Sequence, residues 1–271
     1  MTALNDTLYW AMLKLESKKV LGYSLGLMSY EWLITWGYPI LIESPIIQDI
    51  PKSFPVPVQR AFGVSTEEPD ISYEAYISAQ LLGRFWTLLI SVYGISSSNA
   101  LMAHILEQGF MAYPLSTPVS RREVINTQIG VLLTELILVT SATLGGIYSA
   151  TAFFEVEIDR WQFFRMGILG FCLSAVVSSY SMLLGVLLNS EEKSVALVSA
   201  ITFVYYGLDV VSSLNEGFSR LQDFTPFGLF RPQEVLQGSV LPGTRCLALS
   251  LISGLLLLVT GFVFQRKNLV I

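Results

Sequence analysis

Six long apolar segments, separated by shorter polar ones, restrict what this chain can fold into. An α-helix rises about 1.5 Å per residue, so about 20 apolar residues cross the hydrocarbon core of a bilayer, which is about 30 Å thick. Lipid offers the backbone no hydrogen-bond partner, so such a segment crosses a membrane as a helix. The sequence therefore predicts an all-α membrane protein with six transmembrane helices, at about residues 21–42, 76–103, 124–153, 166–188, 195–211 and 246–264.

The charge and the rare residue types exclude several other classes of protein. Charged residues make up 14% of the chain, against roughly 25% in a soluble domain. The net charge of −5 argues against a nucleic-acid partner. One histidine and two cysteines leave little material for a metal site or a disulfide framework, and we read Cys172 and Cys246 as small buried apolar residues.

Residues 5–19 precede the first apolar segment and have the pattern of an amphipathic helix. Asn5 can cap its start, and Leu8, Met12 and Leu15 fall on one helical face. Lysines follow at the end next to the first span. We expect an N-terminal helix that lies in the membrane interface, with these lysines at the anionic cytoplasmic surface; an ordinary solvated helix is the alternative.

The basic residues near the span ends predict the orientation. With both termini in the cytoplasm, the positive charges on that side are Lys14, Lys18, Lys19, Arg121, Arg122, Lys193, Arg266 and Lys267. Those on the other side are Lys52, Arg60, Arg160, Arg165, Arg220, Arg231 and Arg245. The sets are nearly equal in size, but the first lies close to span ends while most of the second is spread through longer loops. This clustering favours cytoplasmic termini.

The stretch EQGFMAYPLSTPVSR, residues 107–121, lies between the second and third predicted spans. It contains two prolines and runs into the pair Arg121-Arg122, so it is too short and too polar to cross lipid. It must therefore be a turn at one membrane face. Its apolar side chains exceed what a linker needs, which is typical of a contact surface.

This stretch resembles the loop between the second and third spans of ABC-2 type transporter permeases, which reads roughly E-x-G-T-L-x-x-L-L-S-x-P-x-S-R. Phe110 and Pro114 depart from that pattern, and Met111 stands in place of a leucine. The matching residues are Glu107, Gly109, Leu115, Ser116, Pro118, Ser120 and Arg121. The segment TPFGLFRP at 225–232 and the C-terminal tail also resemble this family, so the resemblance covers the whole chain.

The resemblance implies a single ABC-2 type transmembrane domain over residues 1–271. Such a chain is the permease subunit of an exporter in the cell membrane. It forms a dimer with a second copy or with a related permease, which encloses the transport path, and pairs with two separate ATPase subunits. The loop then forms a cytoplasmic coupling helix on the ATPase, with Glu107, Gly109, Phe110, Met111, Tyr113, Leu115, Pro118 and Arg121 as coupling residues. The second and fifth spans line the path, which makes Ser91, Ser97, Ser98, Thr202, Tyr205, Tyr206 and Asp209 its candidate residues.

The chain lacks the loop that would bind nucleotide itself. No G-x-x-x-x-G-K-[ST] motif occurs, so the usual phosphate-binding loop is missing. We therefore expect ATP and Mg²⁺ in the partner ATPase, with no cofactor, metal or catalytic residue in this chain.

Four ionisable residues fall within the predicted spans: Glu31, Arg84, Glu135 and Asp209. Such residues are costly in lipid and usually face the protein interior or a wet cavity. Counted from the predicted span ends, the first three lie at a similar depth, so we expect a charge network in which Arg84 contacts Glu31 first and Glu135 second. The network either holds the helices together or contacts a substrate, and the sequence leaves both open.

Two other functions remain as alternatives. Residues 22–26, GYSLG, match the G-x-S-x-G pattern of serine hydrolases, with His104 as the only histidine that could act as a base. That motif needs a strained strand-turn-helix setting, whereas here it opens an apolar helix. The other alternative is a membrane scaffold or immunity subunit with no transport cycle of its own.

Overall fold

The computed structural model describes residues 4–43, 72–78, 85–109, 119–188, 190–214, 225–236, 238 and 242–267. Within these ranges every regular element is a helix. The elements are α1 (Asp6–Glu43), α4 (Tyr73–Ile77), α5 (Phe85–Asn99), the π-helix η2 (Ala100–His104), α6 (Ile105–Glu107), α8 (Arg121–Phe153), α9 (Arg160–Leu188), α10 (Glu191–Leu214), the 3₁₀ turn η4 (Phe227–Leu229), α11 (Pro232–Leu236) and α12 (Gly243–Arg266).

Five helices in the described ranges are long and apolar enough to cross a membrane. They are Phe85–Glu107, which joins α5, η2 and α6, and then α8, α9, α10 and α12. This agrees with a multi-pass membrane protein. The helix α1 is long enough at 38 residues but is not one of the five, because its charged, tyrosine and glycine residues lower its hydropathy.

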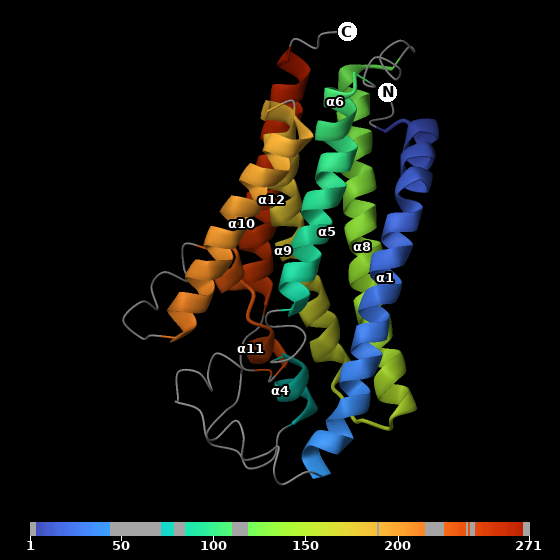
Figure 1. Ribbon diagram of the computed structural model, residues 1–271, viewed down its shortest axis with the longest axis vertical. Coiled ribbons are helices and arrows are strands. Elements are labelled where there is room, and N and C mark those ends of the chain that lie inside the picture. Colours follow the sequence, from blue (N-terminus) through green and yellow to red (C-terminus); the bar gives the residue numbers. More distant parts are fainter. Residues whose placement is uncertain are drawn as a thin grey trace.

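The long helices run alternately up and down the bundle (Figure 1). The start of α1, the end of α6, the start of α8 and the end of α12 all lie at one end, which we call the loop end. The short helices α4 and α11 lie toward the opposite end, where they contact each other. Counting α1, the described part of the chain traverses the bundle six times.

The N-terminal segment differs from the expectation. The sequence suggested a separate interfacial helix over 5–19, but α1 is continuous from Asp6 to Glu43 and passes through Gly22 without a break. Its first turns pack along α8: the Asn5 amide donates to the Thr127 hydroxyl (3.0 Å), and the Tyr9 and Thr134 hydroxyls are 2.8 Å apart.

The helix α9 lies at the centre and contacts α5, α8, α10 and α12. Small residues let its neighbours approach closely, as is common between membrane helices. Gly170 faces the six-membered ring of Trp86, and Gly94 of α5 faces the Ser178 hydroxyl of α9. In contrast, α10 and α12 turn large apolar side chains outward, such as Phe203 (75% exposed) and Leu258 (78% exposed).

Candidate functional site

The predicted coupling loop is described only at its two ends. Phe110, Met111, Tyr113, Leu115 and Pro118 lie outside the described residues, so the expected coupling helix stays a prediction. Gly109 ends the first flank with a positive φ of 69°, and its amide donates to the Leu106 carbonyl (3.3 Å). That backbone conformation favours glycine at the end of a helix.

The flank before the loop is joined to the start of α10. The Glu107 carboxylate accepts from the Glu191 amide (2.8 Å), and the Ser190 hydroxyl lies 3.5 Å from its other oxygen. A carboxylate is stabilising at a helix N-terminus, where backbone amides are unpaired. In return, Glu191 Oε2 lies 2.6 Å from Nδ1 of His104. We call His104, Glu107, Ser190 and Glu191 the α6–α10 clasp.

The flank after the loop is joined to other helices. Ser120 and Glu123 form a capping box at the start of α8. The Arg121 guanidinium donates to the Lys267 carbonyl (2.7 Å), and the Lys267 ammonium donates to the Val186 carbonyl at the end of α9. The two flanks therefore attach to different parts of the bundle: the first to α10, the second to α9 and α12.

Glu135 is fully buried and joins α5 to α8. Its carboxylate accepts from the Tyr93 hydroxyl (3.0 Å) and from the Ser97 hydroxyl. The ring of Tyr93 packs edge-on against Tyr23 of α1. Burial of a carboxylate requires such partners, so these contacts stabilise the junction of three helices.

Glu31 is also fully buried but lies elsewhere in the bundle. Its carboxyl packs against Gly146 of α8, and neither oxygen has a hydrogen-bond partner among the residues that the structure describes. Gly146 is eleven positions beyond Glu135, which is about 16 Å along α8. The two carboxylates therefore do not share one depth.

The assumed register of α1 explains this difference. Residue 21 was expected to lie level with the start of α8, whereas the structure places Asn5 beside Thr127. Arg84 lies outside the described residues, so its contact with Glu31, or with Glu135 as second choice, stays a prediction.

Four of the candidate path residues are buried inside the chain. The Ser98 hydroxyl lies 2.9 Å from the Ser178 carbonyl of α9, Ser97 contacts Glu135, and Ser91 donates to the Thr87 carbonyl (2.7 Å). Thr202 lies 2.6 Å from the Tyr180 hydroxyl. Within one chain Ser97, Ser98 and Thr202 therefore join two helices each, whereas the bond of Ser91 stays within α5.

The other three candidates, Tyr205, Tyr206 and Asp209, are half-buried on α10. Part of each of these three side chains is therefore accessible from outside the single chain.

The α6–α10 clasp and the buried Asn99, which donates to Ser181 (3.0 Å), were not expected from the sequence. A lone asparagine in an apolar helix is a usable signal, whereas nothing in the sequence pairs residues 104 and 191.

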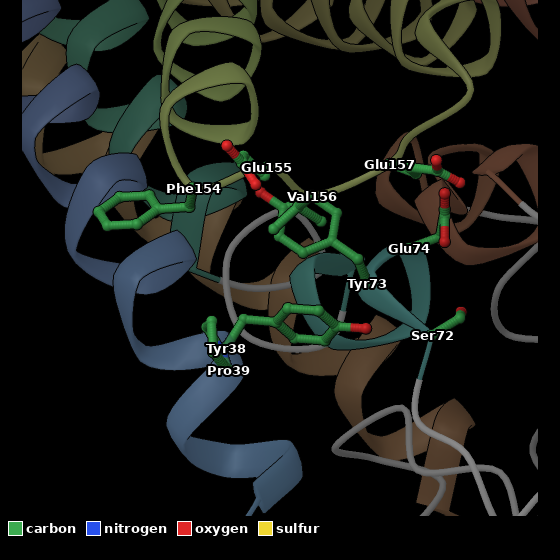
Figure 2. Close-up of a pocket in the computed structure, with 9 residues that line it drawn as sticks. All are labelled: Tyr38, Pro39, Ser72, Tyr73, Glu74, Phe154, Glu155, Val156 and Glu157. Carbon is green, nitrogen blue, oxygen red and sulfur yellow. The ribbon is translucent and has the colours of Figure 1, made fainter.

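A cavity of about 550 Å³ lies near the end opposite to the loop. Figure 2 shows it between α1, α4 and the α8–α9 turn, with Tyr38 and Tyr73 along its wall and Glu74 and Glu157 near its edge. The part of the chain that the structure describes holds no cluster of three side chains fit to bind a metal ion.

The same half of the bundle contains an ion-pair group that attaches α11 to α12. Glu234 contacts Arg231 (2.9 Å) and Arg245 (2.6 Å) through different carboxylate oxygens. Burial raises the pKa of Glu234, but the hydrogen bonds and charges of the two arginines outweigh it and hold that pKa below its usual range.

The Glu234 group should make stability depend on pH. Because its pKa is lowered on folding, ionised Glu234 stabilises the fold above its unfolded pKa, and this contribution is lost as pH falls through the folded pKa. Glu234→Gln should lower the melting temperature in detergent slightly at pH 7, and the difference should disappear in acid. Glu157→Gln, at an exposed carboxylate, is the control; a gap that persists in acid would contradict the assignment.

Comparison with known proteins does not assign the chain to a family. No protein-family model matches the chain, and no curated protein matches it significantly. The function therefore has to be argued from the sequence and the geometry.

Proposed function

We propose that this chain is the permease subunit of an ABC-2 type transporter. It would act as an exporter in the cell membrane, form a dimer around the transport path, and couple to two separate ATPase subunits that hold ATP and Mg²⁺. All six traverses, α1 included, would form its single transmembrane domain. The observation that carries the proposal is the sequence of residues 107–121 together with the place where its flanks lie.

Two features of the flanks support it. The end of α6, which Gly109 follows, and the start of α8, which Ser120 caps, lie at the loop end of the bundle, where α1 begins and α12 ends (Figure 1). A loop that docks on a cytoplasmic ATPase has to share its side of the membrane with cytoplasmic termini. Both flanks are also anchored to long helices, through Glu107 and Arg121, so a displacement of the loop can reach the transmembrane bundle.

The helical setting of residues 22–26 argues against the serine-hydrolase alternative. Residues 22–26 lie in the middle of continuous α1, so the strained turn that exposes a nucleophilic serine is missing there. His104 lies at the loop end in contact with Glu191. Binding of an ATPase would distinguish a transporter subunit from a scaffold or immunity subunit.

The test is whether an ABC ATPase binds through residues 110–118. Phe110→Asp with Leu115→Asp should release the ATPase from the purified complex, since it replaces two apolar contact residues by charges. We expect at least a tenfold loss of co-purified ATPase. The control, Gln108→Asp with Ser116→Asp, adds the same charge without removing apolar side chains and should retain it. Full retention by the first variant would rule out docking at this loop.

The proposed orientation can be tested separately. In a background without Cys172 and Cys246, Gln108→Cys at the loop end and Glu157→Cys at the other end place single thiols at exposed positions. An impermeant thiol reagent should label Glu157→Cys in intact cells and Gln108→Cys only after lysis. The reverse pattern would show that the termini face outside.

A further inference from the structure

We propose that the α6–α10 clasp is the contact that carries movement of the 110–118 loop into α10. The inference rests on the proposed function, because it takes an ATPase as the source of that movement. It assigns a positioning role to His104, Glu107, Ser190 and Glu191, which act on α10 rather than on any substrate. The resemblance made Glu107 a residue that couples to the ATPase; because its carboxylate accepts from the Glu191 amide, we assign it to the contact with α10 instead.

The clasp is reciprocal, so it controls both the position and the direction of α10. Glu107 receives the Glu191 amide at 2.8 Å, and the Glu191 side chain reaches back to His104 at 2.6 Å. His104 and Glu107 are three positions apart, which places them on one face of the helix end. Two contacts between this face and the start of α10 resist both sliding and rotation of α10 relative to α6.

The helix held by the clasp is the least enclosed of the five apolar helices within one chain. Among the five apolar helices, α10 has the smallest buried share in its most apolar stretch, and its main contacts are with α9 and α5. A helix with few buried contacts can shift as a rigid body at a lower cost than the central α9. The opposite flank, through Arg121 and Lys267, holds α12 and α9 instead.

The segment that carries the clasp is itself unusual. The π-helix η2 comes between α5 and α6 and also contacts α10. Single π-helical turns interrupt the regular α-helical hydrogen bonding and occur often at functional sites. The His104 and Glu191 side chains are 45% and 41% exposed, so water can replace their contact when α6 and α10 separate.

The experiment uses the purified complex of the full chain with its ATPase. In a background without Cys172 and Cys246, spin labels at Phe203→Cys on α10 and Ile137→Cys on α8 report the distance between these helices. Labelled chains are diluted with unlabelled ones, so that each distance lies within one chain. The distance distribution is recorded without nucleotide and with a non-hydrolysable ATP analogue.

The wild-type distance should shift with the nucleotide, and Glu107→Ala should reduce that shift at least by half while the ATPase stays bound. Glu191→Ala, which removes only the contact with His104, should give an intermediate shift. Gln108→Ala, at the exposed neighbouring position, should behave as the wild type. If Glu107→Ala fails to fold, Glu107→Gln, which weakens the contact without removing the acceptor, should still reduce the shift.

Each contrary result has a separate meaning. An unchanged shift in Glu107→Ala, or no shift in the wild type with the ATPase bound, would overturn the relay while leaving the proposed function. Loss of the ATPase from Glu107→Ala would also overturn it, because Glu107 would then hold the ATPase. A wild-type chain that binds no ABC ATPase would remove both proposals.

Discussion

Gly146→Ala should destabilise the protein strongly, by about 2–3 kcal/mol, as expected for overpacking of a close-packed interior. A Cβ at this position would overlap the Glu31 carboxylate and lie 3.1 Å from the Met28 Cα. The Met28 contact is with backbone, so α1 itself would have to move away from α8. Because α1 packs mainly on α8, this displacement affects the attachment of the whole helix.

The neighbouring Gly145 provides a matched control. A Cβ at Gly145 meets nothing within 4 Å, so Gly145→Ala should be neutral or slightly stabilising, as alanine favours a helix over glycine. Both variants are compared by thermal unfolding in detergent. Adding Glu31→Ala to Gly146→Ala should recover part of the loss, since the Met28 contact remains. Equal melting temperatures for the Gly145 and Gly146 variants would contradict the close contact of α1 with α8.

Trp86→Ala should cost about 3–5 kcal/mol, the usual range for removing a large buried aromatic side chain. Trp86 is 1% exposed, and its indole N–H donates to the Thr143 hydroxyl of α8 at 2.9 Å. Its ring stacks on Phe230 and faces Gly170 of α9. One side chain therefore joins α5, α8, α9 and the segment before α11, and its loss leaves a cavity among all four.

The measurement is again thermal unfolding in detergent, with yield after size-exclusion chromatography as a second readout. Trp36→Ala is the control, because Trp36 is 55% exposed on α1 and its removal leaves no internal cavity. Trp86→Phe should fall between the wild type and Trp86→Ala, since it keeps part of the ring but loses the bond to Thr143. Similar melting temperatures for Trp86→Ala and Trp36→Ala would show that the interior is not closed around Trp86.

The sequence predicted the bounds of four helices closely. The expected ranges 124–153, 166–188, 195–211 and 246–264 became α8, α9, α10 and α12, which extend each range by six residues or fewer at either end. The reason is local. An apolar segment in lipid has to pair its own backbone groups, so length and hydropathy are enough to predict a helix.

The start of the second expected range, 76–103, lies partly outside the described residues: Tyr73–Ile77 forms α4, the description resumes with α5 at Phe85, and the helical residues then run on to Glu107. For α1, the sequence did not reveal that residues 5–19 and the apolar segment after them form one helix. No local signal distinguishes a helix lying on the membrane from one packed along α8, because the difference depends on what the helix contacts.

By itself, then, the sequence determined that the chain is helical and apolar enough for a membrane, since these follow from local composition and backbone hydrogen bonding. Tertiary packing alone decided which polar side chains meet. The relative register of α1 and α8 separated Glu31 from Glu135, two residues that appeared level when counted along the sequence. The same packing brought His104 to Glu191, 87 positions away, because two helix ends that are distant in the chain lie side by side in the bundle.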